Sequence, residues 1–201
     1  MIKNIILDMG NVLLDYNPNV ILNKVCDNEE EKQIIFKNLF QGPEWIMGDL
    51  GQINNSERYE LVKERVPEHL HKKLKECVDY WDICMVPVNG AKEFCKNVKK
   101  KGYKIFVLSN ACSKFYEYFP KEYDLNFFDG VVVSSDVHII KPNEAIYNYL
   151  LEKYGLVPEE CLFIDDREEN IKAAEKKGIT GFHFDRNDYE GSCQKLRKIL
   201  L

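Results

Sequence analysis

Short apolar runs and helical periodicities alternate along most of this chain. Residues 5–8 read Ile-Ile-Leu-Asp, a β-branched apolar run that is too short for a typical helix and predicts a buried strand. Further runs of this kind predict strands at residues 103–108, 131–133, 161–164 and 179–184. The segments between them predict helices near residues 89–101, 115–119, 142–154, 168–177 and 189–200. Strands that alternate with helices predict an α/β, Rossmann-like fold, in which a parallel sheet has helices on both faces.

The pattern differs between the first strand and about residue 86. No convincing strand follows Pro18, and helical patterns cover residues 19–26, 29–40, a segment that starts with Ser56 as its N-cap, and 67–81. We therefore expect a small all-helical cap at residues 15–85, inserted after the first strand. Residues 1–14 and 86–201 are expected to form the α/β core.

Composition and charge narrow the possible partners. The chain has 201 residues, of which 45% are hydrophobic and 30% charged, as in ordinary globular proteins. Its net charge of -5 argues against a nucleic-acid partner, which usually requires a basic face. Seven cysteines without metal-ligand spacing predict reduced thiols, and no apolar stretch is long enough to predict a membrane span. We expect a cytoplasmic protein, and the sequence does not indicate an oligomeric state.

Polar residues stand at the ends of the predicted strands. Asp8 ends the first strand, Ser109 follows the second, and Asp165 and Asp166 follow the fourth, while Lys141 precedes a helix. The carboxyl ends of parallel strands share one edge of a sheet, so these side chains are expected to converge on one crevice. Neighbouring carboxylates repel one another unless a cation lies among them, and oxygen-rich sites suit Mg²⁺. A metal, an ammonium and a hydroxyl can neutralise and orient a phosphoryl group while an aspartate attacks phosphorus.

In this order the motifs resemble those of the haloacid dehalogenase superfamily, most of whose members are phosphohydrolases. The matching segments are Asp8-Met9-Gly10-Asn11-Val12, Leu108-Ser109-Asn110, Lys141-Pro142-Asn143-Glu144-Ala145-Ile146-Tyr147 and Phe163-Ile164-Asp165-Asp166 with Asn170. The helical insertion is placed like the cap of one branch. The Asp-x-Gly-Asn-Val motif is similar to that of bacterial α-glucose-1-phosphate phosphatase-like proteins. The resemblance implies a Mg²⁺-dependent phosphatase that acts through an aspartyl-phosphate on a small phosphorylated metabolite, for which a sugar phosphate is the candidate.

The resemblance also implies a role for each matching residue of the core. Asp8 corresponds to the nucleophile, which is also a metal ligand. The other implied metal ligands are the main-chain oxygen of Gly10, Asp166, and Asp165 either through water or as a support. The residues implied to bind the phosphoryl group are Ser109, Asn110 and Lys141, with Asn170 supporting the loop.

The cap is expected to contribute to substrate binding. Trp45 and the glycine-rich turns at residues 48–53 are the part expected to face the crevice, because an aromatic side chain beside such turns suits a lid or a sugar-facing wall. Trp45 equally fits the core of the cap. His138 is close enough in sequence to Lys141 to approach the site.

One position departs from the family pattern. Most phosphatases of the superfamily have a second aspartate two residues after the nucleophile, which protonates the leaving group, and here this residue is Gly10. General acid–base catalysis contributes about 10²- to 10⁴-fold to a rate. Asp15, a cap residue or the substrate itself can replace the missing acid.

Other functions therefore stay open. They are a 2-haloacid dehalogenase, a phosphoglucomutase-type enzyme, and a non-catalytic module that binds phosphate or a metabolite. The pair Asp165-Asp166 argues against the dehalogenase, which does not need a metal.

Overall fold

The computed structural model describes residues 1–200, and a five-stranded parallel sheet forms its centre. The strand order is β5-β4-β1-β6-β7. The central strand β1 (Asn4–Leu7) pairs with β4 (Lys104–Ser109) on one side and β6 (Cys161–Asp165) on the other. The outer strands are β5 (Gly130–Val133) and β7 (Thr180–His183). The predicted α/β fold class is confirmed.

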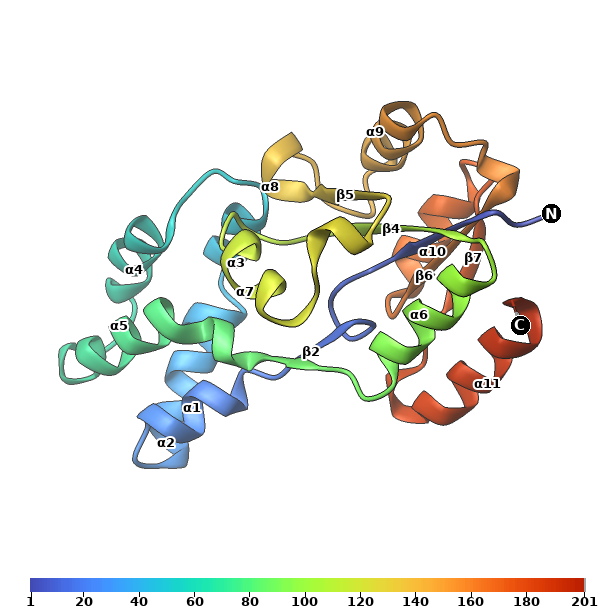
Figure 1. Cartoon of the computed structure of the whole chain (residues 1–201). Coiled ribbons are helices and arrows are strands. Elements are labelled where there is room, and N and C mark those ends of the chain that lie inside the picture. The colour runs from blue at the N-terminus through green and yellow to red at the C-terminus, as the bar shows by residue number, and fades with distance from the viewer. Residues whose placement is uncertain (201) are drawn as a thin grey trace.

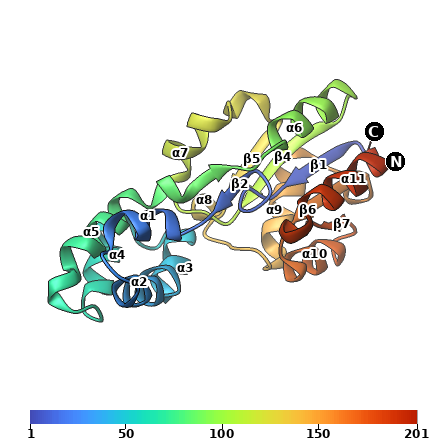
Figure 2. The same ribbon diagram turned by 90° about the horizontal axis from the view of Figure 1, so that it is seen from below.

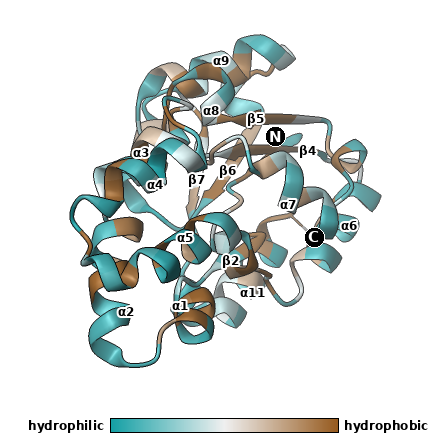
Figure 3. Cartoon of the chain, turned by 90° about the vertical axis from the view of Figure 1, so that its left-hand side faces the viewer, coloured by the Kyte–Doolittle hydropathy of each residue, from teal (hydrophilic) through white to brown (hydrophobic). Residues whose placement is uncertain are grey.

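Helices cover both faces of this sheet. Successive strand residues point to opposite faces, so Ile5 and Leu7 lie in one apolar cluster and Ile6 in the other. The first cluster is covered by α6 (Ala91–Lys100), α7 (Phe115–Glu122) and α11 (Tyr189–Leu200). The second is covered by α9 (Glu144–Tyr154) and α10 (Glu168–Glu175). Figure 1 shows α6 and α11 below the strands and α9 above them, and Figure 3 shows the apolar strands enclosed by helices with polar outer faces.

A few short elements complete the core. The helix α8 (Ser134–Val137) directly follows β5, and three single 3₁₀ turns are η4 (Leu125–Phe127), η5 (Pro158–Glu160) and η6 (Arg186–Asp188). The seven cysteines are free. No helix within residues 1–200 combines the length and the apolar character that crossing a membrane would require.

The segment from Asn19 to Cys84 is helical, and we call it the cap. Its elements are α1 (Asn19–Val25), α2 (Glu29–Ile35), the π-helical turn η1 (Phe36–Phe40), α3 (Pro43–Asp49), α4 (Asn55–Lys63), η2 (Glu68–Leu70), α5 (His71–Tyr80) and η3 (Trp81–Cys84). The cap projects from one end of the core, at the left of Figure 1 and the lower left of Figure 2.

Three features of this region differ from the sequence-based expectation. A two-stranded antiparallel ribbon, β2 (Leu14–Tyr16) with β3 (Met85–Pro87), joins the cap to the core, although no strand was expected between the first one and about residue 86. Strands of three residues are too short to produce a visible alternation of apolar and polar positions. The helix α3 replaces part of the expected glycine-rich turns, and it starts at Pro43, whose fixed φ suits a first helical turn.

The start of α4 is the third difference. Asn54, rather than Ser56, caps this helix, because its side chain accepts a hydrogen bond from the Glu57 amide at 3.0 Å. The Glu57 carboxylate in turn accepts from the Asn54 amide at 2.8 Å, which completes a capping box.

The end of α3 is attached to the core just after β5. The hydroxyl of Ser134 donates a hydrogen bond to the carbonyl of Asp49 at 2.6 Å. The ring of His138 lies 2.8 Å from the carbonyl of Leu50, and since a carbonyl only accepts, Nδ1 carries the hydrogen. We call these contacts the seam; they fix the position of one cap helix relative to the sheet.

Gly51 lies at the seam and provides a test of it. Gly51→Ala is expected to lower the free energy of unfolding by about 2–4 kcal/mol, because φ is +67° and a Cβ would lie 2.5 Å from the carbonyl oxygen of Ser135. Gly102→Ala is the matched control: its φ is +89°, but nothing lies within 4 Å of the new Cβ, so only about 1 kcal/mol of backbone cost is expected. Urea denaturation measures both, and equal losses would contradict a tight seam.

Candidate active site

Asp8 lies directly after the central strand and is almost completely buried. Its amide donates a hydrogen bond to the carbonyl of Ile164 at 2.9 Å, so β6 holds the backbone at this point. One of its carboxylate oxygens accepts from the Met9 amide at 2.7 Å. Because β1 lies between β4 and β6, the ends of those strands place Ser109 and Asp165 on either side of Asp8.

Lys141 reaches into this group of side chains from the loop before α9. Its ammonium nitrogen lies 2.7 Å from Asp8 Oδ1, 2.8 Å from Asp165 Oδ2 and 2.9 Å from the carbonyl oxygen of Leu108. Burial alone would lower the pKa of Lys141, but the attraction of Asp165 and Asp8 outweighs it and raises the pKa. Lys141 is therefore a buried, charged ammonium shared by two carboxylates.

A single ammonium does not neutralise this site. Asp8, Asp165 and Asp166 each place a carboxylate oxygen within 4.8 Å of the others. Burial raises the pKa of Asp8 from 3.8 to about 7; Lys141 acts against this rise, whereas Asp165 and Asp166 add to it. Burial also raises the pKa of Asp166. Such crowded carboxylates indicate a site for a second cation.

The available oxygen atoms fit Mg²⁺. Asp8, Gly10 and Asp166 all line one pocket, and Asp166 is oriented by Asn11, whose side-chain amide donates to it at 2.8 Å. Carboxylate and main-chain oxygens are the ligands that Mg²⁺ prefers. These three residues would hold the ion, which supplies positive charge to orient and neutralise a phosphoryl group.

Asp165 has a different position from Asp166. Both of its carboxylate oxygens accept hydrogen bonds from the Asn170 amide at 3.0 Å, and Oδ1 also accepts from the Arg167 main chain at 2.8 Å. With Lys141 on Oδ2, the protein supplies donors to both oxygens of this fully buried carboxylate. Asp165 and Asn170 therefore orient Lys141, and Asp165 does not face the pocket.

Ser109 and Asn110 also occupy separate places. Ser109 is fully buried at the end of β4, and within residues 1–200 its hydroxyl has no hydrogen-bond partner. Ser109 is not among the residues that line the pocket, so its contact with a phosphoryl group stays a prediction. Asn110 lines the pocket and forms two hydrogen bonds with the main chain of Lys141. Its Oδ1 accepts from the Lys141 amide at 2.8 Å, and its Nδ2 donates to the Lys141 carbonyl at 2.9 Å.

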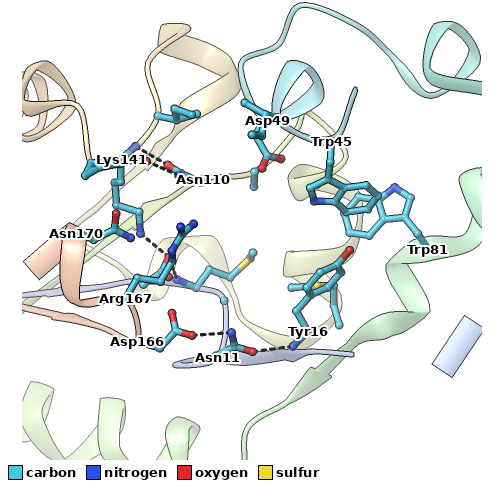
Figure 4. A pocket seen from close by; sticks show the side chains of 18 of the residues that line it. Asn11, Tyr16, Trp45, Asp49, Trp81, Asn110, Lys141, Asp166, Arg167 and Asn170 are labelled. Atoms are coloured by element: carbon cyan, nitrogen blue, oxygen red, sulfur yellow. Dashed lines mark hydrogen bonds and ion pairs between the residues drawn. The ribbon is translucent and has the colours of Figure 1, made fainter. Parts of the chain in front are cut away.

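The pocket in front of the carboxylates has a volume of about 390 Å³ and is lined by both core and cap (Figure 4). Its cap side is aromatic. The ring of Trp45 stacks on Tyr16 at 5.7 Å between centroids and packs edge-on against Trp81 at 5.2 Å. Trp45 is thus a wall of the pocket and also part of the cap core, so both predicted roles apply.

Sequence reasoning did not single out several residues that line the pocket. Asn11 belongs to the first motif, and Tyr16 lies on β2, where strand alternation turns its neighbour Asp15 away from the pocket and into solvent. Asp49 follows Trp45 by four residues, which places both on the same face of α3. The i, i+4 spacing would have revealed this pair if residues 43–49 had been predicted as a helix.

The buried charges predict a large effect of removing Lys141. Lys141→Met is expected to lower the free energy of unfolding by about 3–5 kcal/mol, because it leaves buried carboxylates without their partner. The control is Lys92→Met, which removes an exposed ion pair with Glu122 and should cost less than about 1 kcal/mol. Chemical denaturation in EDTA compares the two, and similar losses would contradict the described charge cluster.

Comparisons with known proteins agree with the fold. A sequence model of haloacid dehalogenase-like hydrolases matches residues 2–178. The sesquiterpene phosphatase astK of Aspergillus oryzae is 23% identical over 205 residues, which cover 98% of this chain and 96% of that protein. The pyrophosphatase PpaX of Bacillus cereus is 24% identical, with 88% of this chain and 80% of that protein covered.

Solved structures share the fold. A HAD family enzyme from Bacteroides thetaiotaomicron, in complex with magnesium and inorganic phosphate, has a TM-score of 0.72 and 22% identity, covering 91% of this chain and 94% of that one. Its magnesium agrees with the Mg²⁺ predicted for this chain. The L-2-haloacid dehalogenase from Xanthobacter autotrophicus has a TM-score of 0.68 and 17% identity, with 98% and 83% covered. The matched residues 2–178 contain the whole carboxylate cluster, and the chain belongs to the family of haloacid dehalogenase-like hydrolases.

Proposed function

We propose that this enzyme is a Mg²⁺-dependent phosphomonoesterase that acts through an aspartyl-phosphate on Asp8. The observation that carries the proposal is the buried Lys141 ammonium, which lies 2.7 Å from Asp8 beside two further carboxylates at the edge of a pocket. A phosphoryl group is a dianion, so its binding requires positive charge close to the nucleophile.

Each core residue has a role in this proposal. Asp8 attacks phosphorus, and Lys141 favours the ionised form of Asp8 and balances the charge of the phosphoryl oxygens. Ser109 donates its free hydroxyl hydrogen to one of these oxygens, while Asn110 fixes the Lys141 main chain. Asp8, the Gly10 carbonyl and Asp166 hold Mg²⁺.

The walls of the pocket suit a small phosphorylated metabolite. The rings of Tyr16, Trp45 and Trp81 offer flat apolar surfaces, which pack equally well on the apolar face of a sugar ring or on a hydrocarbon group. Asp49 and Arg167 add polar groups to the lining. A sugar phosphate is therefore one substrate class to test, and a terpenyl phosphate is another, because a relative of this chain is a sesquiterpene phosphatase.

Hydrolysis of 4-nitrophenyl phosphate provides the direct test. Turnover should require Mg²⁺, stop in EDTA and return when Mg²⁺ is restored. Asp8→Asn should lower kcat by more than about 10³-fold, because the nucleophile is lost. Asp15→Asn is the control and should retain wild-type activity, since Asp15 is exposed on β2.

Other outcomes identify the competing functions. Release of chloride from 2-chloropropionate without Mg²⁺ would indicate a dehalogenase. Formation of a phosphorylated isomer from a sugar phosphate would indicate a mutase. Binding of Mg²⁺ and phosphate with no turnover of any ester would indicate a binding module and would contradict the proposal.

A further inference from the structure

Gly10 leaves this site without an acid next to the nucleophile, and the pocket offers a carboxyl group in another place. We propose that Asp49, on the cap helix α3, is the general acid and base of the reaction. The inference rests on the proposed phosphatase function. It assigns to a cap residue the proton transfers that a core loop residue performs in most phosphatases of the superfamily.

The position of Asp49 supports this role. Asp49 lines the pocket together with Trp45 and Ile46 of the same helix. Figure 4 shows its carboxyl group pointing into the pocket from the side opposite to Asp166 and Asn11. A substrate whose phosphoryl group lies at Asp8 must extend its organic part toward the cap. In this arrangement the oxygen that leaves phosphorus lies between the carboxyl groups of Asp8 and Asp49.

The backbone of Asp49 is fixed relative to the nucleophile. Its carbonyl accepts the 2.6 Å hydrogen bond from Ser134, a fully buried residue at the start of α8. The next residue, Leu50, accepts from His138 at 2.8 Å. A proton donor must be held within hydrogen-bond reach of the reacting oxygen. The seam thus provides the rigid support that a catalytic carboxyl group needs.

The surroundings of Asp49 favour its protonated form. Burial raises its pKa from 3.8 to about 7, and the guanidinium of Arg58 on α4 acts in the other direction. The other titratable groups that face it are Tyr16 of β2, Cys112 of the loop after β4, and Tyr118 of α7. The pKa of each of these three is raised, so all are neutral near pH 7. An acid with a pKa near the working pH is well matched to donating and accepting a proton in one cycle.

The proton transfers balance over the two half-reactions. As an Asp8 oxygen bonds to phosphorus and the ester P–O bond breaks, the Asp49 proton moves to the departing oxygen, which leaves as a neutral alcohol. Asp49 is then a carboxylate. It takes a proton from water as the hydroxide oxygen bonds to phosphorus and the Asp8–phosphorus bond breaks. Phosphate is released, Asp8 is a free carboxylate again, and Asp49 is protonated.

Other candidates for this role have worse positions. Asp15 is exposed and points away from the pocket. His138 has its Nδ1 hydrogen committed to the Leu50 carbonyl and is not among the residues that line the pocket. The pKa values of Tyr16 and Tyr118 are raised, so both hydroxyls stay protonated near neutral pH and cannot accept a proton as a base.

Single-turnover rates of Asp49→Asn with two esters test the proposal. Nitrophenolate leaves without a proton, so its release from 4-nitrophenyl phosphate should change by less than about 10-fold. An alkyl phosphate that the wild type hydrolyses should react about 10²- to 10⁴-fold more slowly, because its alkoxide needs the proton. With the base also absent, the variant should release one nitrophenolate per site in a burst and then accumulate phosphorylated Asp8, detectable by intact mass.

The pH dependence gives a second readout. With saturating Mg²⁺, whose charge keeps Asp8 ionised, the wild-type single-turnover rate constant for the alkyl ester should fall as pH rises through about 7, because Asp49 must be protonated to act as the acid. Asp49→Asn should not show this fall. Asp49→Glu, which retains a carboxyl group, should restore part of the alkyl ester rate, and Asp15→Asn should match the wild type.

The possible failures are distinguishable. An equal loss of rate for both esters in a folded Asp49→Asn protein, with no burst, would show that Asp49 only binds substrate and would overturn the inference. Retention of full alkyl ester activity would overturn it as well. A wild-type protein that hydrolyses neither ester would overturn the proposed function, and the inference with it.

Discussion

The Lys141 ammonium is the interaction on which this active site depends. It lies in a fully buried position between Asp8 and Asp165, and the carbonyl of Leu108 completes its contacts. A buried ion pair is stable only when all its members have partners. Asn110 fixes the main chain of Lys141, and Asn170 fixes Asp165. The Lys141 ammonium thus connects the ends of strands β1, β4 and β6. Three carboxylates against one ammonium leave an excess of negative charge, which is the physical reason for a metal at this edge of the sheet.

Core and cap divide the chemistry between them. In the proposed reaction the core supplies the nucleophile and the charges that bind a phosphoryl group, and the cap supplies the aromatic wall of the pocket and Asp49. Since Gly10 cannot provide a proton, placing the acid on α3 makes the position of the cap part of the reaction itself. The ribbon β2–β3 and the Ser134 and His138 contacts then have a catalytic as well as a structural consequence.

The sequence predicts the core better than the cap, for a physical reason. Each buried strand is an apolar run, and parallel topology alone brings Asp8, Lys141 and Asp166 to one edge. The ribbon strands have three residues each, too few to show an alternating pattern. The helix α3 contains Pro43 and Gly48, which in a sequence indicate turns, so the sequence does not predict it. Asp49 has no sequence signature as an acid. Its raised pKa comes from burial at a pocket that brings together Trp45, Trp81 and Tyr16, residues distant in sequence whose contact appears only after folding.

The fold itself does not separate ester hydrolysis from dehalogenation, since a haloacid dehalogenase shares it. Displacement of a halide needs the same aspartate but neither a cation nor a proton donor, because a halide leaves as a stable anion. Gly10 is therefore compatible with both reactions. Asp166 and Asp49, in contrast, fit ester hydrolysis better than dehalogenation. Both are carboxyl groups at the pocket whose pKa values burial raises, and keeping such groups there has a cost in stability. In the proposed phosphatase reaction Asp166 holds the metal and Asp49 gives a proton to the leaving oxygen, whereas a halide departs without either.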